Sequence, residues 1–144
     1  MRTFATDDGH VVVRLDTGDL LLESVREACA DHGVHTGAVV SAIGTLRNLN
    51  VHYLHTDDLE QEQADRNTML ELDGCWEVTA VEGLIADGDP HLHVTAFDGE
   101  RTVAGHLEEG NEVNALGEVL IRDLEGLELT RRPNEHGVST LERE

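Results

Sequence analysis

The stretch PHLHVTAFDGERTVAGHL, residues 90–107 of a 144-residue chain, decides the fold because it predicts two paired strands. Each arm alternates apolar and polar residues, and the dipeptide Asp98-Gly99 between the arms is typical of a two-residue type I′ turn. That turn would make Phe97 face Glu100 across the hairpin. The sequence therefore predicts an antiparallel hairpin whose register is fixed by its turn.

Three histidines of this hairpin are predicted to share one face of the sheet. The register puts His91 opposite His106 and His93 opposite Ala104, and residues two apart on a strand point to the same side. Opposed Cβ atoms lie about 4.5–5.5 Å apart, so the three imidazoles would converge. Zinc–nitrogen bonds of about 2.0–2.1 Å fit such a triangle. We therefore expect His91, His93 and His106 to hold one divalent metal ion, zinc before others.

The sequence leaves open whether this site binds a metal and whether it catalyses a reaction. A His-x-His pair on an exposed strand can be two polar residues that face water and bind nothing. If an ion is bound, water is the expected fourth ligand, with Glu108 and Glu109 as nearby acids of unassigned strand position. Three protein ligands and an open position describe a catalytic type of zinc site. No catalytic acid or base can be identified, so enzyme activity is left undecided.

The rest of the chain predicts further strands around one helix. Apolar residues recur at helical spacing from Asp19 to His32, and Gly33 suits the position after the helix end. Asp73-Gly74 is typical of a turn between two strands. Runs rich in apolar and β-branched residues predict strands at residues 11–15, 39–44, 49–54, 69–72, 76–85 and 113–124. A mostly antiparallel sheet with one main early helix packed on it makes the expected class α+β.

The chain is strongly acidic. Thirty Asp and Glu face ten basic residues, all of them Arg, for a formal net charge of −20. An acidic, lysine-free surface is typical of proteins adapted to molar salt, where the Debye length falls to about 3 Å. The same charge repels nucleic-acid phosphates and anionic membrane surfaces. We therefore expect a halophilic protein that binds no membrane, and we disfavour direct binding of duplex DNA.

One domain accounts for most of the chain. Residues 1–132 are expected to form it, followed by a polar C-terminal tail at residues 133–144. The N-terminus lacks an apolar signal segment, and no apolar run reaches the roughly 18 residues of a membrane-spanning helix. The sequence therefore predicts a cytoplasmic single-domain protein.

Four motifs, in their order and spacing, resemble those of the plant-and-prokaryote conserved (PPC) domain, which also occurs beside AT-hooks in plant nuclear proteins. The motifs are Ser41-Ala42-Ile43-Gly44, Leu70-Glu71-Leu72-Asp73-Gly74, His91-Leu92-His93 and Gly105-His106-Leu107. The chain departs from the family at Ala104, where a further glycine is common, and it has no AT-hook. The region of resemblance runs from Val11 to Leu129.

The resemblance implies a mixed α/β fold, a homotrimer and a metal ion held by the three histidines. The family often carries a DNA-binding label, mainly through its AT-hook members. The fold is also similar to that of acetolactate decarboxylase, an enzyme with a three-histidine zinc site.

Three functions compete on this basis. The first is a trimeric, metal-binding regulatory domain in which zinc or a bound small molecule tunes assembly or contact with a protein partner. The alternative is a zinc-dependent enzyme of lyase or decarboxylase type acting on a small hydroxy- or keto-acid. The third is a direct DNA-binding protein that uses Arg131 and Arg132. The regulatory domain is favoured because it needs no catalytic acid or base, and DNA binding ranks last because of the net charge.

Overall fold

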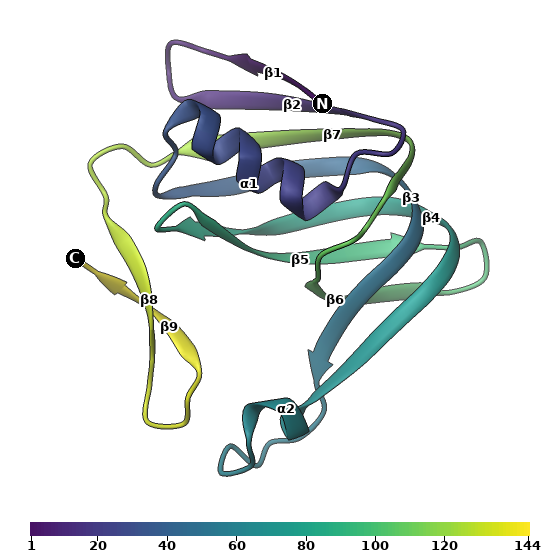
Figure 1. Ribbon diagram of the computed structural model, residues 1–144, viewed down its shortest axis with the longest axis vertical. Coiled ribbons are helices and arrows are strands. Elements are labelled where there is room, and N and C mark those ends of the chain that lie inside the picture. The colour runs from purple at the N-terminus through teal and green to yellow at the C-terminus, as the bar shows by residue number, and fades with distance from the viewer.

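The protein is built mainly from β-strands (Figure 1). The computed structural model describes the backbone of residues 1–144 and every side chain except that of Gln63. The strands are β1 Arg2–Ala5, β2 His10–Asp16, β3 Gly37–Leu54, β4 Asn67–Ala86, β5 Asp89–Phe97, β6 Thr102–Leu107, β7 Val113–Asp123, β8 Leu129–Pro133 and β9 Ser139–Arg143. The helices are α1 Leu21–His32 and α2 Gln63–Arg66. Seven strands form one antiparallel sheet in the order β1-β2-β7-β3-β4-β5-β6, and β8 pairs with β9.

The predicted α+β class is wrong, because the molecule is a large antiparallel sheet with little helix. The strands predicted at 39–44 and 49–54 are one 18-residue strand, β3, and those at 69–72 and 76–85 lie in the 20-residue strand β4. Gly74, at φ 123°, sits where the β3–β4 register shifts opposite Arg47. The dipeptide Asp73-Gly74 therefore makes a bulge within a strand, and the chain does not turn there.

The two long strands close part of the sheet into a ring. β3 pairs with β4, β4 with β5 and β5 with β6, and β6 returns to β3 through the pairs Val51–Leu107 and His52–His106. The side chains of Trp76, Leu49 and Leu107 are fully buried, so the core rests on one large aromatic residue and many aliphatic ones. Ring closure brings the second half of β3 beside the predicted metal-binding hairpin.

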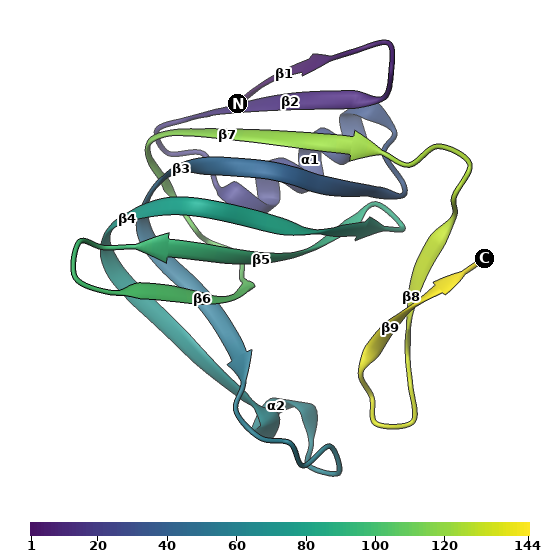
Figure 2. The same cartoon turned by 180° about the vertical axis from the view of Figure 1, so that it is seen from behind.

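The helix α1 covers one face of the sheet (Figure 1), and Figure 2 shows that no helix covers the other. Its apolar residues Leu21, Val25 and Ala28 are buried against the core, as their helical spacing predicts. The helix ends at Gly33, whose φ of 67° is the left-handed conformation that glycine favours. Among the described residues, neither helix has the length and apolar composition needed to cross a bilayer.

Residues 133–144, predicted as a polar tail, belong mostly to a hairpin that stands apart from the main sheet (Figures 1 and 2). Its base is held by two hydrogen bonds: the N–H of Leu129 donates to Thr36 Oγ1 at 3.0 Å, and the N–H of Asp87 donates to the Leu129 carbonyl at 3.0 Å. The hairpin therefore has a fixed attachment beside the start of β5.

Candidate metal centre

The turn between β5 and β6 lies one residue later than predicted. The N–H of Asp98 donates to the Arg101 carbonyl at 3.2 Å, so the two turn residues are Gly99 and Glu100. The Asp98 carboxylate accepts hydrogen bonds from the N–H groups of Glu100 and Arg101, each at 2.9 Å. An aspartate whose carboxylate accepts these N–H groups stands just before the two turn residues. Gly99 is therefore the first turn residue, and its φ is 101°.

The later turn changes which histidines are opposite each other but leaves them on one face. His93 pairs with His106, so the predicted pairing of His91 with His106 is wrong. The difference is two residues along the strand, which preserves the side to which each residue points. Leu92 and Val94, on the opposite face of β5, are buried.

The three imidazoles form a compact cluster. The ring centroids of His91 and His106 are 4.6 Å apart, those of His93 and His106 5.5 Å, and those of His91 and His93 5.6 Å. Each ring offers one nitrogen, and these nitrogens all lie within 4.8 Å of one another. Imidazole nitrogens are ligands that divalent zinc accepts in tetrahedral sites. The donor set and its spacing therefore fit a divalent metal ion.

The surroundings keep two of these rings uncharged at neutral pH. Burial, assisted by the neighbouring His91 and His52, lowers the pKa of His106 to about 4. Burial and then the nearby Arg131 guanidinium also lower the pKa of His91 below its usual value. A metal binds the neutral imidazole, so the environment favours the protonation state that a ligand needs.

His52 and Glu108 extend the cluster, and the sequence did not identify His52 as part of it. The His52 ring centroid lies 4.4 Å from that of His106, and His52 Nδ1 is hydrogen-bonded to Glu108 Oε1. His52, His106 and Glu108 make a second group whose ligand atoms lie within 4.8 Å of one another. His106 is common to both groups, so one imidazole faces two alternative ligand sets.

A buried asparagine places Glu108. The side chain of Asn111, which is 0% exposed, donates to the carbonyls of Asn50 at 3.1 Å and Glu108 at 2.7 Å. Its Oδ1 accepts the N–H of Asn50 at 2.8 Å. These bonds tie the segment after β6 to β3, which holds the Glu108 carboxylate at the histidines.

The histidines open onto a cavity of about 590 Å³. It lies among α1, the histidine cluster, the α2 region and the β8–β9 hairpin, and its wall includes His52, His91 and His106. The acids Asp89, Glu108 and Glu109 also line it, so a small molecule in the cavity would contact both imidazoles and carboxylates.

Gly105 lets β6 approach β3 closely, and its replacement should loosen the site. A Cβ at this position would lie 2.7 Å from the His52 carbonyl oxygen and 3.2 Å from Val51 Cβ. Gly105→Ala is expected to lower the free energy of unfolding by about 1–3 kcal/mol because the two backbones must separate. Denaturant unfolding measures this. Ala104→Ser, at the exposed neighbouring position, serves as the control and should change stability by less than about 0.5 kcal/mol. Equal stability of the two variants would contradict the close-approach argument.

Comparison with known proteins identifies relatives of this fold. No curated protein matches the chain. A protein from Bacteroides thetaiotaomicron, provisionally named as DNA-binding, superposes with a TM-score of 0.83 at 17% identity and covers 98% of this chain and 96% of its own. A metal-containing protein from Archaeoglobus fulgidus has a TM-score of 0.77 at 26% identity over 97% and 98% of the two chains. A plant- and prokaryote-conserved protein from Pyrococcus horikoshii has a TM-score of 0.77 at 26% identity and covers 96% of this chain and 97% of its own.

The sequence itself matches a family over most of its length. Residues 2–125 match the Plants and Prokaryotes Conserved (PCC) domain, and these residues include the whole seven-stranded sheet and all four histidines of the cluster. The β8–β9 hairpin lies beyond the matched residues. The fold, the ordered motifs and this match agree, and the chain belongs to the Plants and Prokaryotes Conserved domain family.

Proposed function

We propose that the protein is a trimeric, metal-binding regulatory domain that holds zinc at His91, His93 and His106. The observation that carries the proposal is the convergence of these three imidazoles, whose ligand nitrogens lie within 4.8 Å of one another. A relative at 26% identity is a metal-containing protein, which supports a bound ion here. Zinc is the expected ion because three imidazoles and an open position are a common zinc environment.

An exposed apolar strip supports association of several chains. Val40 and Ile43 on β3 are each 51% exposed, and Leu116 on the neighbouring β7 is 48% exposed. Large exposed apolar side chains on neighbouring strands favour contact with another protein surface. One face of the sheet is left uncovered by helix, which leaves room for such contact (Figure 2). The resemblance to the family makes a homotrimer the expected assembly.

The proposal is tested by metal content and mass in solution. Untagged protein purified without chelators is expected to hold one zinc per chain and to scatter light as three times the chain mass of 15.8 kDa. Removal of zinc by a chelator should change the assembly or its stability if the ion is regulatory. A metal-free monomer in all conditions would overturn the proposal.

A second candidate, the zinc-dependent lyase, is favoured by one observation. Glu108 places a carboxylate within 4.8 Å of a ring nitrogen of His106 and at the cavity wall, and it would supply the acid or base that the sequence alone did not identify. A bound ion would polarise the carbonyl or hydroxyl group of a small hydroxy- or keto-acid. Conversion of such an acid by the zinc-loaded chain, lost in Glu108→Gln, would support this function, and the absence of conversion would exclude these substrates.

Direct DNA binding ranks third on electrostatic grounds. Arg131 and Arg132 do not form a shared basic patch, because Arg131 donates to backbone carbonyls whereas Arg132 faces Glu142 at 3.7 Å. A trimer would also triple the net charge of −20. Titration of random duplex at several salt concentrations checks this ranking, and sub-micromolar binding would reverse it.

A further inference from the structure

We propose that the cavity beside the histidine cluster binds an organic anion with an apolar body, whose carboxylate or phosphate group is held by Arg131 and Arg66. The inference deepens the proposed function and rests on it, because the ligand would lie beside the same histidines. The residue Arg131 lies on β8, outside the matched family residues 2–125.

The carboxylates that line the cavity already have partners. Asp89 Oδ1 lies 3.3 Å from Arg26 Nε, and Glu109 Oε1 lies 2.9 Å from Arg26 Nη1. Glu108 is hydrogen-bonded to His52. Arg26 therefore pairs with two of the three acids, and the third acid, Glu108, pairs with an imidazole. The acids leave the other two arginines of the cavity wall without a carboxylate of their own.

Arg131 is one of these two arginines. Its Nη1 donates to the Asp89 carbonyl at 3.3 Å and its Nη2 to the Leu84 carbonyl at 3.1 Å. Among the described side chains no carboxylate lies within 4 Å of its guanidinium, and the charge of Asp89 acts on it only from farther away. Arg131 lines the same cavity as His91 and His106, so an anion that it holds would lie beside the histidine cluster. A planar guanidinium that is held by carbonyls and keeps its positive charge is suited to a carboxylate or phosphate.

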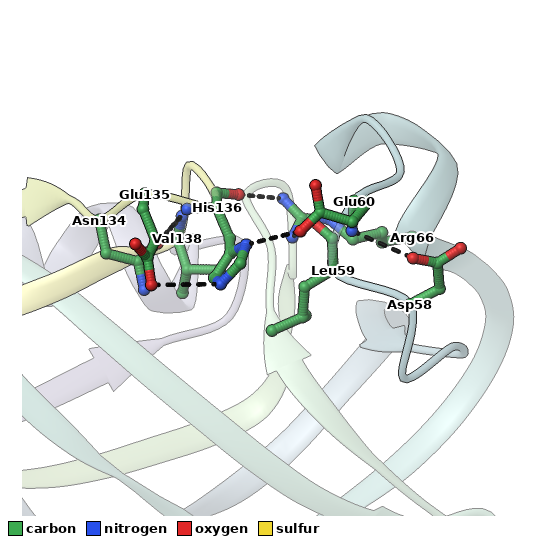
Figure 3. A network of polar contacts seen from close by, with 8 residues as sticks. All are labelled: Asp58, Leu59, Glu60, Arg66, Asn134, Glu135, His136 and Val138. Carbon is green, nitrogen blue, oxygen red and sulfur yellow. Dashed lines mark hydrogen bonds and ion pairs between the residues drawn. The ribbon is translucent and has the colours of Figure 1, made fainter.

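Arg66 is the other, and it is only 2% exposed. Its Nη1 donates to the Leu59 carbonyl at 3.2 Å. Its Nη2 donates to the His136 carbonyl at 2.9 Å, a contact that Figure 3 shows between the α2 region and the tip of the β8–β9 hairpin. Its Nε is buried and finds no hydrogen-bond partner among the described residues. A buried cation without a counter-ion is costly, so an anion in the cavity would stabilise this side chain.

Apart from Asn67 and Ser139, the remaining wall residues are apolar, which sets the body of the ligand. The apolar walls are formed by Leu22, Leu54, Leu59, Pro90, Leu107 and Val138. The volume of about 590 Å³ lies in the range of about 300–1,000 Å³ that small organic ligands occupy. An inorganic ion would leave most of this volume and all of these apolar walls unused. The arginines, the apolar walls and the adjacent imidazoles together select an organic anion.

Calorimetric titration with three six-carbon probes tests the inference. Hexanoate and hexyl phosphate carry the same apolar body with a carboxylate or a phosphate, and hexan-1-ol carries it without charge. At least one of the two anions is expected to bind at least tenfold more tightly than hexan-1-ol, and the stronger of them identifies the head group. Equal binding of all three probes, or no binding of either anion at millimolar concentration, would overturn the inference.

Two arginine variants locate the site. Arg131→Gln should weaken anion binding at least tenfold, because it removes a charge-assisted pair. Arg132→Gln is the matched control: it is the next residue on the same strand, is exposed, and is absent from the cavity wall. Unchanged binding in Arg131→Gln, or equal loss in both variants, would contradict the assignment. Thermal unfolding checks that both variants fold; should Arg131→Gln not fold, the comparison of anion with alcohol on the unchanged chain decides.

Parallel zinc analysis separates this inference from the proposed function. Each titration is run on zinc-loaded and chelator-treated protein. A chain that holds zinc but binds no anion would overturn only the anion site. A chain that binds hexanoate at Arg131 but never holds zinc would overturn the metal function while leaving the anion site standing.

Discussion

Replacement of His91 and His93 together by alanine is expected to abolish zinc binding, from one ion per chain to none. The two residues supply two of the three ligand nitrogens that lie within 4.8 Å of one another, and His106 alone cannot hold an ion against a competing buffer. Metal analysis of untagged protein after dialysis against zinc measures the effect. Both residues lie on the solvent side of β5, so the variant should fold.

A matched double variant shows whether the loss is specific. His35→Ala with His55→Ala removes two exposed histidines outside the cluster and should leave the stoichiometry unchanged. The single variant His52→Ala distinguishes the two ligand groups: zinc is retained if the ion sits at His91, His93 and His106, and is lost if it sits at His52, His106 and Glu108. Equal zinc content in the His91/His93 double variant and the unchanged chain would refute the three-histidine site.

Removal of salt is expected to lower the thermal unfolding midpoint by about 10 °C or more, given that about 1 kcal/mol shifts the midpoint by a few degrees in a chain of this size. Twenty excess negative charges repel one another, and their screening length grows from about 3 Å in molar salt to about 30 Å in dilute salt. Among the described side chains, only six carboxylates form ion pairs with arginine, so most of the thirty acids have no fixed cation nearby.

Calorimetry in dilute and molar potassium chloride measures the shift, and sucrose supplies the control. Sucrose stabilises folded proteins by exclusion from their surface without screening charge, so it should recover less of the lost stability than salt does. A midpoint that is unchanged or higher in dilute salt would contradict adaptation to high salt.

The common face of the hairpin histidines could be predicted although the turn could not. Side chains alternate strictly along a strand, so an error of two residues in the pairing of His106 leaves His91 and His93 on the correct side. The turn itself depended on whether Asp98 would occupy the turn or cap it. Its two hydrogen bonds to the following N–H groups decide that choice, and both positions suit aspartate in a sequence.

The role of His52 could not be predicted because it depends on pairing between distant strands. His52 and His106 are brought together by the β3–β6 contact, which has no local signal in either segment. The same limit applied to the length of β4. Gly74 suits a turn as well as a bulge, and only the pairing of β4 with β3 shows that the strand continues through it. In the sequence, Arg131 stands out only as half of the pair Arg131-Arg132, and nothing local to it indicates a cavity.

The two-pair contact between β3 and β6 has a consequence for local opening of the molecule. It is the shortest strand pairing in the four-strand ring. The free energy of opening, measured by amide hydrogen exchange, should therefore be lower there than in the neighbouring strand pairs. An ion on His91, His93 and His106 would be held by β5 and β6 alone, so the β3–β6 pairing could still open. An ion on His52, His106 and Glu108 would join β3 to β6 and the segment after it, so it would oppose opening of the β3–β6 pairing. The choice of ligand set is thus also a choice between a ring that opens and one that does not.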